Sequence, residues 1–283
     1  MNDSRHLFQP PSPKRRSLKP SVFWRIADDI PKRLSWQLMV VSVVVPFLAW
    51  WVVSHAIQGN DQLSFFLPTP EAVWAAAVEL WQEGLLLKDI AASCYRVGVA
   101  FLMAATLSVP VGILMGSFAS IRALLEPIIG IVRYMPVPAL TPLLIIYFGV
   151  DEASKIALIF IGTLFFNILM IMDGVKFVPK ALIETTYTLG GSRLQVLLRV
   201  IVPYTIPKII DTFRINFAAA WQLVTVAELI AASEGLGKRI ALARKFNGTD
   251  RIFVCLIVLG LIGFLIDLFF RQLQRNACRW AVD

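Results

Sequence analysis

The sequence predicts an all-α polytopic membrane protein with about six transmembrane helices, on the basis of its composition and its apolar runs. Of its 283 residues, 57% are hydrophobic and 16% are charged, whereas average soluble domains contain roughly 25% charged residues. The mean hydropathy of +0.70 points the same way. A hydrocarbon core about 30 Å thick requires about 20 mostly apolar residues per helix, and several runs of that length occur here.

Each expected span is an apolar run bounded by polar or charged residues. The third run is punctuated by prolines, which disfavour a straight helix, and the fifth carries polar residues along one stripe. An even number of spans places both termini on one side of the membrane. The expected spans are Trp36–His55, Tyr95–Met115, Leu124–Phe148, Ile156–Ile171, Phe213–Ile230 and Ile252–Phe270.

The charges around the spans predict that both termini are cytoplasmic. Cytoplasmic segments carry an excess of Lys and Arg, and such an excess precedes the first span and follows the last. The first external loop is acidic, so the net charge of +8 reflects topology and not nucleic-acid binding. We therefore expect a multi-pass protein of the plasma (inner) membrane, with the lipid bilayer as its surroundings. The basic residues are Arg5, Lys14, Arg15, Arg16, Lys19, Arg25, Lys32, Arg33, Arg271, Arg275 and Arg279, and the acidic ones are Asp61, Glu71, Glu79, Glu83 and Asp89.

The chain is expected to divide into three segments. Residues 1–34 form a basic cytoplasmic tail, and its Pro-rich stretch Pro10–Pro20 is typical of a disordered tether. No obvious small-residue cleavage site separates this tail from the first span, which we expect to remain as a signal anchor. Residues 35–275 form the transmembrane domain, which includes a long polar connection at 177–208, and residues 276–283 form a cytoplasmic tail.

The sequence offers little material for a catalytic or metal site. The cysteines Cys94, Cys255 and Cys278 lack CxxC or Cys/His ligand spacing, and histidine occurs only at His6 and His55. No HExxH, GxSxG or convergent carboxylate set is present, so an intramembrane enzyme is disfavoured. The stretch GLGKR lacks the first P-loop glycine and has arginine where Ser or Thr belongs. We therefore expect no catalytic residue, metal or nucleotide site in this chain.

The long polar connection predicts a helix, a double-glycine corner and a second helix. Pro179 suits the first position of a helix, and Gly190-Gly191 stops it because glycine accepts the left-handed conformation at a helix end. Ser192 and Gln195 then form an S-x-x-Q capping box, and the second helix runs until Pro203. A rigid elbow of this kind suits the transmission of motion from a soluble partner.

The same residues resemble the EAA loop of importer-type ABC permeases. The chain has Glu184-Thr185-Thr186, three residues, Gly190, nine residues and Val200-x-Val202-Pro203, where the usual form is E-A-A-x3-G-x9-I-x-L-P. The spacing matches throughout, although two threonines replace the alanines and two valines replace Ile and Leu. Each threonine lowers helix propensity by a few tenths of a kcal/mol. A helical hairpin at the membrane interface without a partner is the alternative interpretation of this loop.

Other segments are similar to the same family over roughly residues 65–275. They are LPTPEAV (Leu67–Val73), the proline-punctuated Glu126–Gly149 and AELIAASEGLG (Ala227–Gly237). Their order and spacing suggest the branch that imports nitrate, bicarbonate, taurine and aliphatic sulfonates. The resemblance therefore implies a type I ABC importer permease fold with a cytoplasmic helix-turn-helix coupling loop and a small anion of this kind as the solute.

The resemblance also implies partners. A separate ABC-type ATPase would bind ATP and Mg²⁺, an external substrate-binding protein would deliver the solute, and a second permease subunit, in a homodimer, would complete the path. This chain would then be a non-catalytic membrane subunit without a cofactor of its own. The implied ATPase-coupling residues are Glu184, Thr185, Thr186, Gly190, Gly191 and Pro203.

One stripe of the fifth span is polar or small and is interpreted as a pathway or dimer wall. Polar residues inside a span need partners or water, so interhelical hydrogen bonding is the alternative. Glu228 could pair with an arginine or help to gate the path. The stripe consists of Arg214, Ala218, Trp221, Thr225 and Glu228, with Gln222 beside it. Together with the third span, the candidate pathway residues are Arg133, Trp221, Gln222, Thr225 and Glu228.

Three further charged features are Arg133, the pair of Asp267 and Arg271, and the basic external loop after the fifth span. Arg133 and the loop each have two interpretations. Arg133 could attract an anion, while a structural ion pair or snorkelling toward the cytoplasm is the alternative. Asp267 and Arg271, at i and i+4, predict a local ion pair. The external loop after the fifth span is either a basic vestibule for a receptor protein or anions, or a solvated amphipathic hairpin. Its basic residues are Lys238, Arg239, Arg244, Lys245 and Arg251.

A gradient-driven secondary transporter is the main rival to an ATP-driven importer. Such a protein would take up solute as a purified chain alone. A permease subunit would instead co-purify with an ATPase and lose uptake without ATP.

Overall fold

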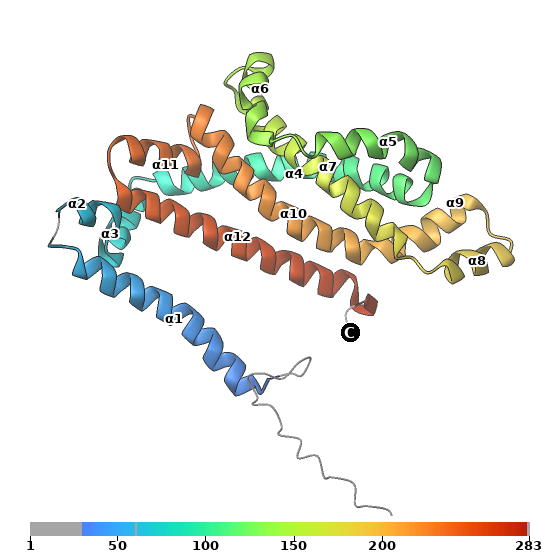
Figure 1. Cartoon of the computed structure of the whole chain (residues 1–283), viewed down its shortest axis with the longest axis horizontal. Coiled ribbons are helices and arrows are strands. Elements are labelled where there is room, and N and C mark those ends of the chain that lie inside the picture. The colour runs from blue at the N-terminus through green and yellow to red at the C-terminus, as the bar shows by residue number, and fades with distance from the viewer. Residues whose placement is uncertain (1–29, 60, 282–283) are drawn as a thin grey trace, which may run out of the picture. The chain divides into compact units, whose positions relative to one another are not determined.

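A computed structural model describes residues 30–59 and 61–281, and there it consists of helices and connections without strands (Figure 1). The chain divides into two units between residues 55 and 56. The first unit holds most of α1 (Lys32–Ala56), an apolar helix long enough to cross a membrane. Most of the predicted tail at 1–34, with its stretch Pro10–Pro20, lies outside the described residues, as do the last two residues of the tail at 276–283.

The second unit is a bundle of long helices with short helices at both ends (Figure 1). The long helices are α4 (Leu85–Ser117), α7 (Glu152–Lys176), α10 (Val202–Ala231) and α12 (Thr249–Ala277). The short α-helices are α2 (Asp61–Phe66), α3 (Pro70–Gln82), α5 (Ala119–Val132), α6 (Thr141–Phe148), α8 (Lys180–Thr188), α9 (Arg193–Val196) and α11 (Leu236–Lys245). Short 3-10 or π-helical turns are η2 (Val137–Leu140), η3 (Leu197–Ile201) and η4 (Arg279–Ala281).

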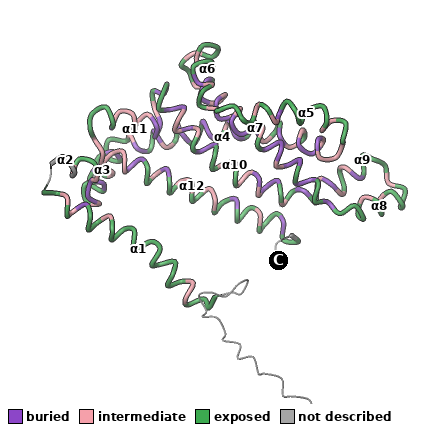
Figure 2. The backbone as a smooth tube through the Cα atoms, in the orientation of Figure 1, coloured by how far each residue is buried: buried purple, intermediate pink, exposed green. Residues whose placement is uncertain are grey.

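The core of the second unit lies where α4 and α10 both pack against α7. Buried positions concentrate on these three helices, whereas α12 and α5 are largely exposed (Figure 2). Gly112 and Gly116 of α4, spaced as in small-xxx-small packing motifs, face Ile171 and Val175 of α7. A Cβ at either glycine would lie within 2.8 Å of those side chains. The close approach of α4 and α7 therefore depends on residues without side chains.

Helices occupy all six predicted spans, but α4 and α10 begin earlier than predicted. α4 begins at Leu85 and not near Tyr95, because Asp89, which lowers the hydropathy of this first part of the helix, is paired with Arg239 inside the bundle. α10 begins at Val202 because the helix runs on from the connection before it. A hydropathy analysis ends a predicted span where charged residues begin. The helix itself can continue past these residues when their charges are paired.

The third predicted span is bent, as its prolines indicated. α5 and α6 meet at 82° across a break that contains η2, Pro136 and Pro138. Among the described residues, α1, α4, α7 and α12 are long and apolar enough to cross a membrane, and the bent pair is a fifth if it counts as one span. α10 is also long enough, with 30 residues, but polar side chains lower its hydropathy.

Candidate functional site

The connection between α7 and α10 protrudes from one end of the bundle as a helical elbow, residues 179–203 (Figure 1). α8 ends in a Schellman motif, in which the amide of Gly191 donates to the carbonyl of Thr186 and the amide of Gly190 donates to that of Tyr187, both at 2.9 Å. Gly190 has a φ of +82°, which favours glycine. A Cβ on Gly191 would lie 2.7 Å from the Thr186 carbonyl oxygen. The two glycines therefore form the corner for different reasons.

The second arm of the elbow begins with the predicted capping box. The Ser192 amide donates to Gln195 Oε1 at 2.7 Å, and the Gln195 amide donates to Ser192 Oγ at 3.3 Å. Two predicted bounds are wrong: Pro179 is the N-cap of α8, and the second helix does not end at Pro203. The turn η3 is π-helical, and the amide of Val202 bonds one residue further back than in an α-helix. This wider turn accommodates a proline without ending the helix.

The outer surface of the elbow is exposed, and its base is buried. Glu184 and Thr185 of α8 are exposed. At the base, Val196 and Ile201 are buried in an apolar cluster that includes residues of α4, α7 and α10. The elbow is thus fastened to the bundle while it presents an apolar surface to its surroundings. The exposed apolar side chains are Leu182, Leu189, Leu194 and Leu198, of which Leu189 is 82% exposed.

We expect Ser192→Ala to destabilise the second arm of the elbow by about 1 kcal/mol, because the N-cap hydroxyl is lost. Hydrogen exchange at the amides of Gln195 and Val196 should accelerate about fivefold. Ser117→Ala is the matched control, because that hydroxyl donates to a carbonyl of its own helix, α4. Equal exchange in the two variants would contradict the capping role.

A groove of about 540 Å³ lies beside the break between α5 and α6. Arg133 and Tyr134 line it from the break, and Gln222 lines it from α10, among mostly apolar neighbours. Arg133 Nη2 donates to the Tyr134 hydroxyl at 2.8 Å. The structure thus brings Arg133 and Gln222, two predicted pathway residues, to one groove from distant parts of the chain.

The other predicted pathway residues lie at contacts between helices. Trp221 is buried, and its Nε1 donates to the carbonyl of Leu259 on α12 at 2.9 Å. Glu228 is fully buried and pairs with Arg96, as one of its predicted roles required. Thr225 is half-buried. In this conformation Trp221 and Glu228 form hydrogen bonds between helices, which was the alternative to a role in the solute path.

An ion pair also joins α10 to α12 closer to the elbow. Arg214 Nε lies 3.4 Å from Asp267 Oδ1, across the two helices. The predicted local pair of Asp267 with Arg271 is confirmed at 2.7 Å. Asp267 therefore pairs with two arginines, Arg214 on α10 and Arg271 on α12.

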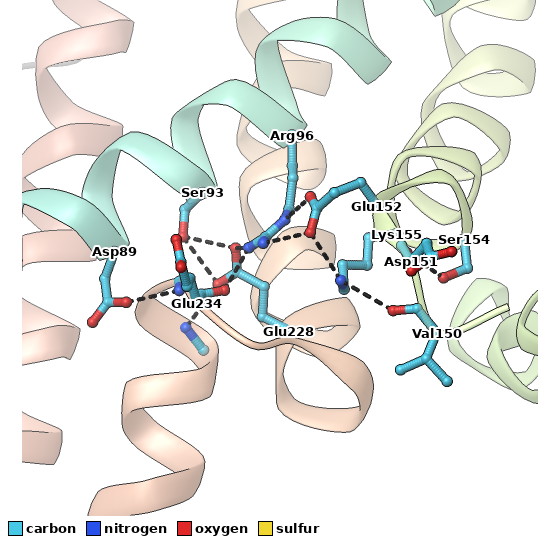
Figure 3. Close-up of polar contacts among 12 residues, drawn as sticks. Asp89, Ser93, Arg96, Val150, Asp151, Glu152, Ser154, Lys155, Glu228 and Glu234 are labelled. Atoms are coloured by element: carbon cyan, nitrogen blue, oxygen red, sulfur yellow. Dashed lines mark hydrogen bonds and ion pairs between the residues drawn. The ribbon is translucent and has the colours of Figure 1, made fainter.

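A largely buried charged cluster joins α4, α7, α10 and α11 at the end of the bundle opposite the elbow, with Glu152 as its half-exposed member (Figures 1 and 3). Arg96, only 2% exposed, lies at its centre. Its guanidinium donates to both oxygens of Glu152 on α7, with Nη2 to Oε1 at 2.8 Å, and its Nη1 donates to Glu228 Oε1 on α10 at 2.6 Å. The cluster consists of Asp89, Ser93, Arg96, Glu152, Lys155, Glu228 and Arg239.

Every carboxylate of the charged cluster faces a cation. Besides Arg96, the Lys155 ammonium lies 3.0 Å from Glu152, and Arg239 Nε lies 2.7 Å from Asp89. Removing one partner of a buried ion pair costs about 3–5 kcal/mol, because an uncompensated charge is left behind. The cluster is therefore a strong joint between helices as long as all of its members are present.

The two loops predicted to be external meet at this same end. Lys88 pairs with Glu234 at 2.7 Å, and Arg251 pairs with Glu79 at 3.0 Å. Glu79 and Asp89 of the first loop neutralise part of the basic surplus in the second, whereas Lys88 pairs with one of the acidic residues of that second loop. Arg244 and Lys245 of that loop are exposed.

Ser93, Arg96 and Glu152 were not predicted as functional residues. A usable signal existed, because Arg96 and Glu228 are charges inside apolar runs, and such charges need partners. No spacing in the sequence links them, since the contact joins helices that are distant along the chain. The partner of each charge is visible only in the folded bundle.

Comparison with known proteins gives one consistent result. The family described as binding-protein-dependent transport system inner membrane component matches residues 108–277. The chain is 34% identical over 262 residues to the taurine transport system permease protein TauC of Escherichia coli (strain K12), covering 88% of this chain and 94% of that protein. It is 33% identical over 250 residues to the putative aliphatic sulfonates transport permease protein SsuC of Bacillus subtilis (strain 168), covering 88% and 89%.

A similar fold occurs among solved structures. A chain of the MetNI methionine ABC transporter, in an inward-facing conformation, superimposes with a TM-score of 0.61 and 19% identity. The match covers 68% of this chain and 96% of that one. At this identity the likeness concerns the fold alone.

Proposed function

Because the chain belongs to the family of binding-protein-dependent transport system inner membrane components, we propose that its helical elbow docks a separate ATPase whose ATP hydrolysis drives import. The chain is an ABC transporter permease. ATP and Mg²⁺ are bound by the ATPase, and this chain contributes no catalytic residue, metal or cofactor. An external substrate-binding protein supplies the solute.

The exposed elbow is the observation that carries this proposal. Glu184, Thr185 and Thr186 lie on its first arm, and Gly190 lies at its corner. An exposed apolar patch beside them is typical of a surface that a partner covers. Since the second arm continues through η3 and Pro203 into α10, displacement of the elbow by an ATPase would move α10 directly.

The elbow, the N-terminus and the C-terminus face the cytoplasm in this proposal. Gln274, near the basic end of α12, donates to the carbonyl of Pro207 at the start of α10 at 3.3 Å. The elbow and the basic C-terminal segment therefore share one end of the bundle. The excess of Lys and Arg in cytoplasmic segments supports this orientation.

The groove beside the bent pair α5 and α6 is the proposed part of the solute path. Arg133 supplies a positive charge, and Gln222 supplies an amide that donates and accepts hydrogen bonds. Such a lining suits a small anion such as nitrate, bicarbonate, a sulfonate or taurine. The names of the relatives, which refer to taurine and aliphatic sulfonates, support this class.

A second copy of the chain completes the path in this proposal. Large apolar side chains are exposed on α5 and on α6, the two helices of the bent pair. We propose that a second copy of the chain covers them, so that the subunit is one half of a homodimer. The most exposed of these side chains are Leu124, Ile128 and Ile131 of α5 and Ile146 and Tyr147 of α6.

Reconstitution of the chain with its ATPase and binding protein tests the function. We expect co-purification of the chain with the ATPase, and uptake of radiolabelled taurine or nitrate into proteoliposomes only when ATP is present at the ATPase side. Omitting ATP or the binding protein should reduce uptake to background. Uptake by the purified chain alone, driven by an ion gradient, would instead support a secondary transporter and overturn the proposal.

A further inference from the structure

We propose that the charged cluster is an outer relay, which carries the displacement of α10 to α11, the helix that faces the external binding protein. This inference rests on the proposed function, because it requires an ATPase at the elbow and α11 on the outer side. Within the relay, Asp89 and Ser93 of α4 and Glu228 of α10 are positioning residues. They hold α11 by its N-terminus.

The first turn of α11 is capped by other helices. Helices usually satisfy their first amides with a Ser, Thr, Asp or Asn of their own at the N-cap. Here the N-cap is Gly235, which has no side chain to offer, and its amide donates to Asp89 at 2.8 Å. The amide of Leu236 donates to Ser93 Oγ at 3.0 Å, and the amide of Gly237 donates to Glu228 at 2.8 Å. Negative charge at a helix N-terminus is also favourable for the helix dipole.

The same three side chains are bonded to one another or to the rest of the cluster. Ser93 Oγ donates to the Glu228 carboxylate at 2.8 Å, so one hydroxyl bridges α10 and α11 (Figure 3). The second oxygen of Asp89 binds Arg239, in the second turn of α11. Separation of α11 from α4 or α10 would leave buried amides and carboxylates without partners, which is unfavourable in a membrane protein.

Close packing of the α10–α11 connection against the end of α10 also holds these two helices together. A Cβ on Gly237 would lie 2.6 Å from the carbonyl oxygen of Thr225 and 2.8 Å from the Cβ of Glu228. Gly235 has a φ of +121°, which L-residues with side chains rarely adopt. The chain between α10 and α11 therefore folds tightly back on the end of α10, and the two helices move together.

α10 connects this joint to the elbow. It is assigned as one helix from Val202 to Ala231, and 30 residues at 1.5 Å per residue correspond to about 45 Å. Its first turn follows η3 of the elbow, and Glu228 lies in its last turn. A displacement that the ATPase imposes at one end therefore reaches α11 through one continuous helix and the charged cluster, although Pro207 removes one backbone hydrogen bond within that helix.

The far end of α11 offers the surface that the relay would move. Arg244, Lys245, Phe246 and Asn247 are exposed there, with Phe246 74% exposed. Two cations beside an exposed aromatic ring suit a protein surface that presents carboxylates around an apolar patch. We assign this turn as a contact for the external binding protein.

The ratio of stimulated to basal ATP hydrolysis tests the relay. In reconstituted complexes, Ser93→Ala should leave basal hydrolysis and ATPase assembly unchanged while the stimulation by loaded binding protein falls at least fivefold. Ser93→Thr, which keeps the hydroxyl, should restore most of the stimulation. Ser108→Ala is the matched control, because Ser108 is equally buried in α4 but its hydroxyl donates only to the carbonyl of Ala105 in its own helix.

Two outcomes of this assay overturn the relay. One is that Ser93→Ala retains the stimulation seen with Ser108→Ala, and the other is that basal and stimulated hydrolysis fall together. The wild-type complex is measured first: if its uptake does not depend on ATP, the proposed function fails and the relay fails with it. Normal wild-type coupling with an unaffected Ser93→Ala variant overturns the relay alone.

A distance measurement decides the question if Ser93→Ala does not assemble. Of the described cysteines, Cys94 on α4 is exposed, whereas Cys255 and Cys278 are buried. In complexes diluted with unlabelled chain, the distance between a spin label at Cys94 and a spin label at Arg244→Cys of the same chain should be equal with and without ATP. In a Cys94→Ala background, the separation between the two labelled copies of position 244 should change with ATP. A change in the first distance, or none in the second, contradicts the relay.

Discussion

Replacing Arg96 with methionine is expected to cause a large loss of stability. The substitution leaves Glu228, which is fully buried, and Glu152 without the guanidinium they share. An uncompensated buried charge of this kind costs about 3–5 kcal/mol. At roughly 2–4 °C per kcal/mol for chains of this size, thermal unfolding of the detergent-solubilised protein should shift downward on the order of 10 °C.

Arg271→Met is the matched control for this prediction. Arg271 also pairs with a carboxylate, at 2.7 Å from Asp267, but its side chain is 57% exposed. Exposed pairs contribute about 0–1 kcal/mol, so this variant should unfold near the wild-type temperature. Adding Glu228→Gln to Arg96→Met should recover part of the loss, since one buried charge disappears. Equal shifts for Arg96→Met and Arg271→Met would show that the cluster does not hold the bundle together.

Local chemistry explains which parts of the fold were predictable. The corner at Gly190-Gly191 and the capping box of Ser192 and Gln195 depend on neighbouring residues, and the structure contains both as predicted. The all-α class follows equally from the length and composition of the apolar runs. In each case the residues that form the structure lie within a few positions of one another.

Contacts between distant residues explain what was not predicted. α4 begins before Tyr95 because Asp89 finds partners at the N-terminus of α11 and at Arg239, which hydropathy does not register. The prolines between α5 and α6 indicated a break, but the 82° bend depends on how both helices pack. Likewise, the groove that joins Arg133 to Gln222 exists only after the bent pair has folded.

Pro203 shows a third kind of limit. Proline lacks an amide donor, and its position after a short amphipathic run predicts a helix end. The chain instead inserts the π-helical turn η3 and continues into α10. Proline is also compatible with a continuous helix in this chain, as Pro46, Pro110, Pro127 and Pro207 show, so its position alone does not tell whether a helix ends there.

Replacing Gly190 with aspartate is expected to abolish ATP-driven uptake while the chain itself still folds. The position has a φ of +82°, which Asp adopts more readily than most residues, and no atom lies within 4 Å of a Cβ built there. The cost to folding should therefore be small, about 1 kcal/mol. Because Gly190 is exposed at the corner of the elbow, the new carboxylate would instead enter the surface that we propose to contact the ATPase.

Gly190→Asn separates charge from backbone strain. Asparagine has nearly the same shape as aspartate and tolerates the left-handed conformation, but it carries no charge. We expect Gly190→Asp to weaken association with the ATPase more than tenfold in a pull-down titration, and Gly190→Asn to remain within about threefold of wild type, since a buried unpaired charge costs several kcal/mol at an interface. If both variants bind the ATPase as the wild type does, the elbow is a membrane-surface hairpin, and the docking site lies elsewhere on the cytoplasmic face.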